Sequence, residues 1–165
     1  MNIQDLFNLD KKIAFISGGA TGIGRMAAEA MAMAGARVLI ASRKGSLCAS
    51  VAEELNQKGY KGTVEGFEGD LSSEAGVEAV VKEIKIRTGQ LNILMNNAGR
   101  SWGAPLGSFP HNAWEKVMSL NVAGLFSLTQ SLIPLLEKSA THEDPARVIN
   151  VGSVMGEIPM GDGAY

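Results

Sequence analysis

Five short apolar runs alternate with helix-length amphipathic segments along the whole chain. The apolar runs are KKIAFIS (residues 11–17), RVLIAS (37–42), TVEGF (63–67), LNILMN (91–96) and RVINVGS (147–153). Continuous runs of this length are typical of buried strands, and strands that are joined through helices run parallel. Such crossovers are right-handed in nearly all proteins, so helices cover both faces of the sheet. The pattern predicts a doubly wound α/β fold with a Rossmann-like parallel sheet of about five strands.

The segments between these runs have the three- and four-residue spacing of helices. In the first, a single apolar stripe is expected to end at Gly35, and it consists of Ile23, Met26, Ala27, Ala30, Met31 and Ala34. A second helix, marked by Leu47, Val51 and Leu55, is predicted to end near Gly59. A third, marked by Val77, Val80, Val81 and Ile84, is predicted to end near Gly89. A longer helix is predicted from about residue 111 to 137, with an exposed loop at 140–146. No internal repeat or linker divides the chain, so residues 1–165 are expected to form a single domain.

Composition excludes several classes of function. The formal net charge of −2 provides no basic field for nucleic acid, and no lysine or arginine run indicates a membrane patch. The one cysteine, Cys48, and the two histidines have no metal-ligand spacing, so no metal is expected. The amino terminus lacks the features of a signal peptide, and no uninterrupted apolar stretch is long enough for a membrane span. These features favour a cytoplasmic protein without a nucleic-acid or membrane partner.

The sequence SGGATGIG stands where the first strand gives way to the first helix. Its glycines Gly18, Gly22 and Gly24 have the spacing GxxxGxG. A glycine turn in this position presents free backbone N–H groups and the positive end of a helix, which together attract a pyrophosphate. Gly18 would allow the tight turn, Gly22 the close approach of phosphate, and Gly24 close packing of helix on strand. The alternative is an ordinary glycine-rich βα turn.

The chain resembles the compact branch of the short-chain dehydrogenase/reductase family. That branch carries TGxxxGIG at the glycine turn, and here Ser17 replaces the threonine. Further matches follow in order: GDLSS with Asp70, NNAG at residues 96–99, a helical Asn121, Ser153 and Tyr165. SWGAPL and WEKVMSLNV look most similar to bacterial 3-oxoacyl reductases, including the branch associated with rhamnolipid production.

The resemblance implies a dinucleotide site that is built from several loops. The residues expected to bind the cofactor are Gly18, Ala20, Thr21, Gly22, Ile23, Gly24, Ser42, Arg43, Asp70, Leu71, Asn97, Ala98 and Gly99. Asp70 would accept a hydrogen bond from the adenine amino group, or it would simply cap the following helix. Asn97 to Gly99 would lie against ribose, and in the family this turn also braces the sheet.

The end of the second strand, IASRKG, bears on the choice of cofactor. NAD-selective enzymes place a carboxylate here, whereas this chain has Ser42 and Arg43. A guanidinium could pair with a 2′-phosphate, so NADP(H) is favoured over NAD(H). Alternatively, Arg43 and Lys44 are solvated charges. Thr21 weakens the argument, because some NADPH-using relatives have a basic residue at that position.

Three residues are candidates for the chemistry. Asn121 is expected on an apolar helix face with Trp114, Val117, Met118 and Leu125, so its amide needs partners. The family assigns it to a water relay, and a buried amide that ties two helices together is the alternative. Ser153 is expected to end the fifth strand, where its hydroxyl could bind a substrate carbonyl.

Tyr165 follows Ser153 by twelve residues, which is enough chain to bring its phenol beside that hydroxyl. Tyrosine would supply the proton and NADPH the hydride for reduction of a ketone to a secondary alcohol. Apolar residues of the neighbouring loops favour a substrate with hydrophobic character, such as an acyl thioester: Trp102, Met155, Ile158, Pro159 and Met160.

In the family a lysine four residues after the tyrosine lowers the phenol pKa, and two further strands follow. Neither is present in this sequence, so we expect the N-terminal portion of a longer one-domain reductase that forms a homodimer or homotetramer at full length. Its open sheet edge is expected to expose apolar surface. The alternative function is a nucleotide-binding fragment without turnover. An epimerase or dehydratase on the same fold would have a different glycine spacing.

Overall fold

Parallel strands form the centre of the fold. The computed structural model describes residues 6–105, 107–156, 158 and 163–164. Its main sheet has the order β3-β2-β1-β4-β6, and every neighbouring pair is parallel. The strands are β1 (Ile13–Ser17), β2 (Arg37–Ser42), β3 (Thr63–Glu68), β4 (Ile93–Asn96) and β6 (Arg147–Asn150). The prediction of a doubly wound α/β fold with five parallel strands is confirmed.

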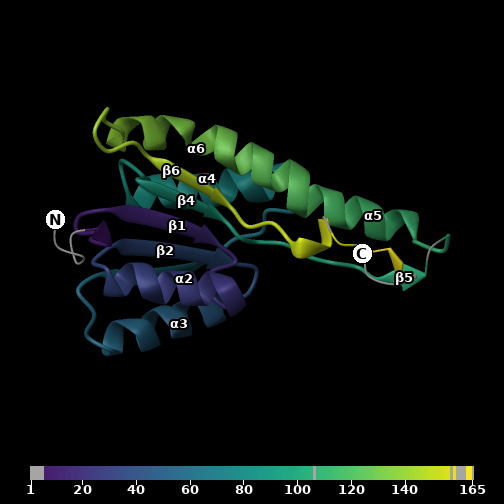
Figure 1. Cartoon of the computed structure of the whole chain (residues 1–165), viewed down its shortest axis with the longest axis horizontal. Coiled ribbons are helices and arrows are strands. Elements are labelled where there is room, and N and C mark those ends of the chain that lie inside the picture. Colours follow the sequence, from purple (N-terminus) through teal and green to yellow (C-terminus); the bar gives the residue numbers. More distant parts are fainter. Residues whose placement is uncertain (1–5, 106, 157, 159–162, 165) are drawn as a thin grey trace.

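Helices cover both faces of this sheet (Figure 1). One face carries α2 (Gly22–Met33) and α3 (Gly45–Gln57). The other carries α4 (Glu74–Arg87) and a long helix that consists of α5 (His111–Met118), the π-helical segment η1 (Ser119–Gly124) and α6 (Leu125–Ser139). After β6 come the short 3-10 helix η2 (Val154–Gly156) and β7 (Gly163–Ala164), which pairs antiparallel with β5 (Ala104–Pro105).

Alternation along the strands divides the hydrophobic core into two layers. Phe15 of β1 packs with α4 and α6, whereas its neighbours Ala14 and Ile16 pack with α2 and α3. The same alternation places Leu39 of β2 in the first layer and Val38 in the second. Successive side chains of a strand point to opposite faces, so a strand that is apolar at every position requires a helix layer on each side.

The face that α2 buries differs from the predicted stripe. Its buried residues are Gly24, Ala28 and Ala32, whereas Ile23 and Met26 are 57% and 62% exposed. The helix is apolar on two faces, and the face of small residues packs against the sheet because it permits closer approach. Gly35 has a φ of +103°, and so the predicted end of this helix is confirmed.

The predicted apolar stripe of the long helix is confirmed only in part, since Val117, Met118, Asn121 and Leu125 are half-buried. Trp114 is 55% exposed, and the buried positions are instead Ala113, Leu120, Gly124 and Leu128. The π-helical segment between residues 119 and 124 widens the turn and changes which side chains face the sheet. The spacing of an ordinary α-helix therefore does not predict which residues are buried on both sides of this segment.

The helix from His111 to Ser139 is long and apolar enough, by length and composition, to cross a membrane. In this structure its inner face is part of the core, since Leu128, Leu132, Leu135 and Leu136 are buried against α4 and the sheet. The core helix of a soluble protein meets the same criteria, and this helix is compatible with that role.

Strand β6 forms one edge of the sheet and ends three residues before Ser153. Its pairing with β4 stops at Asn96 and Asn150, because β4 itself ends there. All four residues of β6 are exposed, among them Val148 and Ile149. Within the described residues no strand pairs with its outer edge, so the expected open apolar edge is confirmed.

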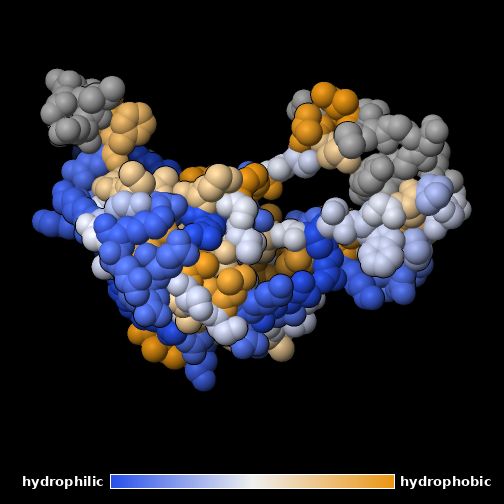
Figure 2. Space-filling model, turned by 90° about the horizontal axis from the view of Figure 1, so that it is seen from below, coloured by the Kyte–Doolittle hydropathy of each residue, from blue (hydrophilic) through white to orange (hydrophobic). Residues whose placement is uncertain are grey.

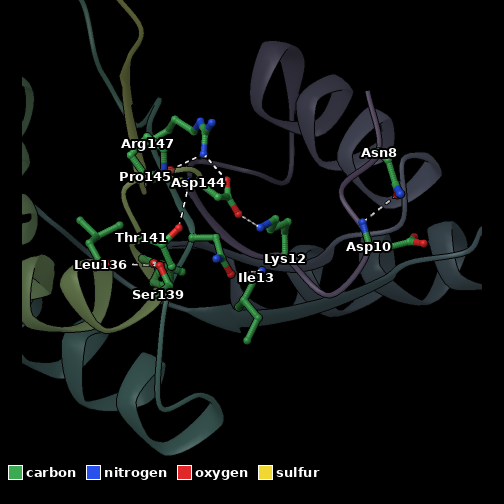
Figure 3. Close-up of polar contacts among 12 residues, drawn as sticks. Asn8, Asp10, Lys12, Ile13, Leu136, Ser139, Thr141, Asp144, Pro145 and Arg147 are labelled. Carbon is green, nitrogen blue, oxygen red and sulfur yellow. Dashed lines mark hydrogen bonds and ion pairs between the residues drawn. The ribbon is translucent and has the colours of Figure 1, made fainter. Parts of the chain in front are cut away.

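The loop at residues 140–146 lies at the amino-terminal edge of the sheet (Figure 3). Its Asp144 forms ion pairs with Lys12, which precedes β1, and with Arg147, which begins β6; the latter pair is at 2.7 Å. Thr141 Oγ1 accepts a hydrogen bond from the Asp144 backbone N–H at 3.0 Å. These contacts hold the two strand starts together at the edge opposite the candidate site.

Candidate active site

A cleft of about 410 Å³ opens at the carboxyl-terminal edge of β1, β2 and β4. The residues that line it and that the sequence predicted as cofactor contacts are Gly18, Ala20, Thr21, Ser42, Arg43, Asp70, Leu71, Asn97, Ala98 and Gly99. Sequence reasoning missed several further lining residues, which include Ser17, Lys44, Leu47, Val80 and Leu120. Gly22, Ile23 and Gly24 do not line it. In open α/β sheets this edge is where ligands bind.

The glycines of the turn differ in what their missing side chains permit. Gly18 and Gly22 have φ values of +68° and +52°, a backbone conformation that favours glycine. A Cβ on Gly24 would lie 2.4 Å from both the Asn97 side-chain nitrogen and the Gly18 carbonyl oxygen. The first two glycines therefore shape the turn, and the third brings the start of α2 against it.

Ser17 joins the glycine turn to the NNAG loop. Its buried hydroxyl oxygen accepts hydrogen bonds from the backbone N–H groups of Asn97 and Ala98, at 3.1 and 3.0 Å. In return, the Asn97 side-chain nitrogen donates to the carbonyl oxygens of Ser17 and Gly18, at 3.0 and 3.1 Å. The two loops form one hydrogen-bonded unit. A hydroxyl is what this site requires, which explains why serine can stand where the family pattern has threonine.

Asn96, the first residue of NNAG, braces the sheet. Its side-chain nitrogen donates to Thr129 of α6 at 2.9 Å and to Asn150 of β6 at 2.8 Å. The side chain is buried, and it links β4 to the edge strand and to the covering helix. The expectation that this turn braces the sheet is confirmed.

Two helices begin at the cleft without a side-chain cap. Thr21 precedes α2 and Lys44 precedes α3, and neither side chain accepts a hydrogen bond from its helix. Neither first turn contains an acidic residue. By contrast, α4 is capped by Ser73, whose hydroxyl oxygen accepts a hydrogen bond from the Gly76 backbone N–H at 3.2 Å. Its first turn also contains the acidic residue Glu74. Uncapped N-termini leave N–H groups and partial positive charge for an anion.

Asp70 lies on the opposite side of the cleft from the glycine turn, after β3. Burial raises the pKa of Asp70, but hydrogen bonds from Ser72, together with the charges of Arg43 and Arg100, outweigh it and hold the pKa below its usual value. Its Oδ1 accepts the Ser72 backbone N–H at 2.9 Å. Since Ser73 caps α4, Asp70 does not, and its ionised carboxylate borders the cleft.

Asn121 lies in the π-helical segment and binds the chain just beyond NNAG. Its Oδ1 accepts the Arg100 backbone N–H at 2.9 Å, and its Nδ2 donates to the Arg100 carbonyl oxygen at 2.8 Å. The expectation that this amide has partners is confirmed. The next residue inward, Leu120, lines the cleft, and a Cβ on Gly124 would lie 2.0 Å from the Leu71 carbonyl oxygen. The π-helical segment thus contacts two loops of the site.

The remaining catalytic candidates are placed only in part. Ser153 is exposed beyond the end of β6, and its Oγ accepts the Met155 backbone N–H at 3.2 Å. Tyr165 lies outside the described residues, as do Pro159 and Met160. The pairing of β7 with β5 brings the chain back to the segment that follows NNAG.

The apolar residues expected beside the active site are exposed or half-buried where the structure describes them. Trp102 is 49% and Ile158 60% exposed, and Met155 is half-buried. Figure 2 shows hydrophobic surface on the projecting part of the molecule, beside the residues drawn in grey. Within the described residues no group of histidine, cysteine and acidic side chains could hold a metal ion.

Comparison with known proteins gives concordant matches. The family model described as short chain dehydrogenase matches residues 12–165. A rhamnolipids biosynthesis 3-oxoacyl-[acyl-carrier-protein] reductase from Pseudomonas aeruginosa is 48% identical over 159 residues, which are 96% of this chain and 61% of the relative. A 3-oxoacyl-[acyl-carrier-protein] reductase, FabG, from Aquifex aeolicus is 32% identical over 148 residues, or 90% of this chain and 58% of the relative.

Solved structures agree with these matches. The Pseudomonas aeruginosa RhlG/NADP active-site complex superposes with a TM-score of 0.88 at 48% identity, covering 96% of this chain and 61% of that one. A gluconate 5-dehydrogenase from Burkholderia cenocepacia, in complex with NADP and tartrate, gives a TM-score of 0.83 at 30% identity, covering 98% and 61%. The chain spans about three fifths of the length of these relatives.

Proposed function

The chain belongs to the short-chain dehydrogenase/reductase family, and on that premise we propose that it is the dinucleotide-binding part of an NADPH-dependent reductase. The reaction would reduce the ketone of a 3-oxoacyl substrate to a secondary alcohol. The observation that carries this proposal is the cleft with two uncapped helix starts, one at Thr21 and one at Lys44, because NADP carries phosphate at two separate places.

The residues present fit this cofactor. The pyrophosphate would lie on the N–H groups between Gly18 and the start of α2. The 2′-phosphate would lie at Ser42, Arg43 and Lys44, which line the cleft. No carboxylate follows β2 directly in the sequence, at the position where NAD-selective enzymes have one.

The opposite wall of the cleft would hold the adenosine. Asp70 is held ionised and would accept a hydrogen bond from the adenine amino group, while Leu71 and Val80 would contact the ring. Ala98 and Gly99 would lie against ribose. The Ser17 hydroxyl fixes the backbone at Asn97 and Ala98, so this part of the contact surface exists before the cofactor binds.

When bound, the cofactor would supply a hydride. The chain's own residues would supply the rest: the Ser153 hydroxyl would donate a hydrogen bond to the substrate carbonyl oxygen, and the Tyr165 phenol would give that oxygen its proton. Asn121 would fix the loop at Arg100 beside this centre, and the relay of protons through water that is assigned to it in the family would start from this position.

We also infer a cytoplasmic protein that forms homodimers or homotetramers. Support comes from the long helix, whose outer side chains Val122, Phe126 and Ile133 are 50%, 64% and 43% exposed. Exposed apolar groups of this size are typical of contact surfaces between proteins.

Binding without turnover is the second candidate function. It is favoured by the position of the cleft, whose lining residues fall between Phe15 and Leu120 and do not include the catalytic candidate Ser153. A phenol has an ordinary pKa near 10, which suits proton transfer at neutral pH poorly without a nearby positive charge.

One experiment separates the two. The 165-residue chain is incubated with NADPH and an acetoacetyl thioester while absorbance at the NADPH band is followed, and NADPH binding is measured in parallel by fluorescence. Oxidation of NADPH that depends on the thioester would exclude the binding-only function. Binding of NADPH without oxidation would support it.

A further inference from the structure

The hydroxyl of Ser42 lies against a buried thiol. Its Oγ is 3.1 Å from the Sγ of Cys48, a residue with no exposed surface that belongs to the core shared by α2 and α3. The same Oγ accepts the Lys44 backbone N–H at 3.2 Å. Ser42 lines the cleft, whereas Cys48 does not, so the thiol meets the site only through this serine.

We propose that Cys48 is a positioning residue for the 2′-phosphate of NADP(H), acting through Ser42. This inference rests on the proposed function. A serine hydroxyl has one proton to donate and two lone pairs that accept. With the Lys44 N–H on one lone pair and the thiol proton on the other, the single hydroxyl proton is left to point towards a phosphate oxygen.

Without the thiol, the Ser42 hydroxyl can donate its hydrogen bond to a backbone carbonyl oxygen instead of to a phosphate. The Lys44 carbonyl oxygen lies 3.5 Å from Ser42 Oγ, at the outer limit for a hydrogen bond. A thiol can both donate and accept. The Cys48 thiol can therefore accept a hydrogen bond from the serine hydroxyl when no phosphate is present. When a phosphate is bound, the thiol can donate a hydrogen bond to the serine oxygen instead.

The position of Cys48 is fixed by the packing of α3 on β3. A Cβ on Gly66 would lie 2.2 Å from the Cys48 carbonyl oxygen, so the helix approaches this strand closely only because residue 66 is glycine. The Cys48 backbone N–H also donates to the Lys44 carbonyl oxygen at 3.1 Å. The thiol is thus held beside the serine in advance of ligand binding, so the serine need not gain a new donor when a phosphate binds.

The test measures the dissociation constants of NADPH and NADH for the wild-type chain and for Cys48→Ala. Loss of one weak hydrogen bond is expected to raise the NADPH constant about three- to tenfold, while the NADH constant changes less than about twofold. Cys48→Ser, which keeps a donor at this position, should restore most of the NADPH affinity. Val51→Ala removes volume from the same buried core and should leave the NADPH-to-NADH ratio unchanged.

A double-mutant cycle with Ser42→Ala tests whether Cys48 affects phosphate binding through Ser42. If Cys48 acts through the serine, Cys48→Ala should have no further effect on NADPH binding once Ser42 is alanine. Cys48→Val, which retains volume, replaces Cys48→Ala if that variant does not fold. The inference is overturned if the ratio of the two constants is unchanged in Cys48→Ala, if both constants rise equally, or if the effect persists in the Ser42→Ala background. A wild-type chain that does not prefer NADPH would instead contradict the proposed function.

Discussion

Asn121 and the main chain of Arg100 exchange two hydrogen bonds, at 2.9 and 2.8 Å, across the gap between the long helix and the NNAG loop. An amide side chain here imitates a neighbouring strand, since it offers one acceptor and one donor to one residue's backbone. The π-helical segment presents it at this position. Segments of this kind occur often at functional sites.

Replacement of Asn121 should destabilise the chain and loosen this loop. Asn121→Leu leaves the Arg100 N–H and carbonyl without their partners, which costs about 1–3 kcal/mol in the free energy of unfolding. Urea denaturation followed by circular dichroism measures the change. Asn112→Ala, at an exposed position of α5, is the matched control and should change stability by less than about 0.5 kcal/mol. Equal stability of the two variants would mean that the paired bonds contribute nothing.

The third glycine of the turn should not tolerate a side chain. In Gly24→Ala the new Cβ would lie within 2.4 Å of Asn97 and Gly18, so α2 must move away from the turn. Cofactor affinity should fall at least tenfold, which fluorescence titration with NADPH would measure. Gly89→Ala serves as the control, because a Cβ there meets no atom within 4 Å. Similar affinities in both variants would count against a phosphate site at this helix start.

Arg43 should determine the preference between the two nicotinamide cofactors. Arg43→Asp removes a guanidinium and adds a carboxylate that repels the 2′-phosphate and can accept ribose hydroxyls. NADPH affinity should fall and NADH affinity rise, so that their ratio moves at least tenfold towards NADH. Lys85→Asp, on α4 and away from the cleft, makes the same change of charge and should leave the ratio unaltered. An unaltered ratio in Arg43→Asp would remove Arg43 from the phosphate site.

Acid should weaken the ion pairs that Asp144 forms with Lys12 and Arg147 at the amino-terminal edge of the sheet. Hydrogen bonds from Lys12 and then Arg147 hold the pKa of Asp144 below its usual value. Since the folded-state pKa is the lower one, the carboxylate stabilises the fold above its unfolded-state pKa, and this stabilisation is lost as the pH falls through the folded-state value.

Asp144→Asn should therefore be less stable than wild type at neutral pH, and the difference should shrink below about pH 4. Thermal unfolding at a series of pH values measures it. Glu143→Gln, at the adjacent exposed position, is the control and should run parallel to wild type. A constant difference between Asp144→Asn and wild type at every pH would show that the ion pairs do not stabilise the fold.

The sequence predicted the sheet and the loops of the site because these depend on local patterns. Apolar runs identify the strands. The glycine turn between β1 and α2 can be located from the local sequence alone, without knowledge of the tertiary contacts. The buried face of α2 was mispredicted because both of its faces are apolar, and spacing cannot tell which one meets the sheet. The spacing of apolar residues also does not reveal the π-helical segment, which changes the side of the helix that faces the sheet. The exposure of Trp114 was therefore not predicted.

Contacts between distant segments could not be predicted at all. The Ser17 hydroxyl binds two backbone N–H groups eighty and eighty-one residues further along the chain. The contact between the Cys48 thiol and Ser42, although only six residues apart, was missed as well, because it depends on how α3 packs on β3. Lys44 could have been found from the sequence as part of the anion site, because it is a basic residue at a helix start where Ser, Thr, Asp or Asn is usual.

The proposed function requires the cleft to bind a dinucleotide with phosphate at the uncapped starts of α2 and α3. Isothermal titration of the 165-residue chain with NADPH and with NADH tests it most directly, because it needs no substrate and no turnover. One binding site is expected for NADPH, with at least tenfold higher affinity than for NADH. Equal affinity for the two, or no heat of binding with either, would contradict it.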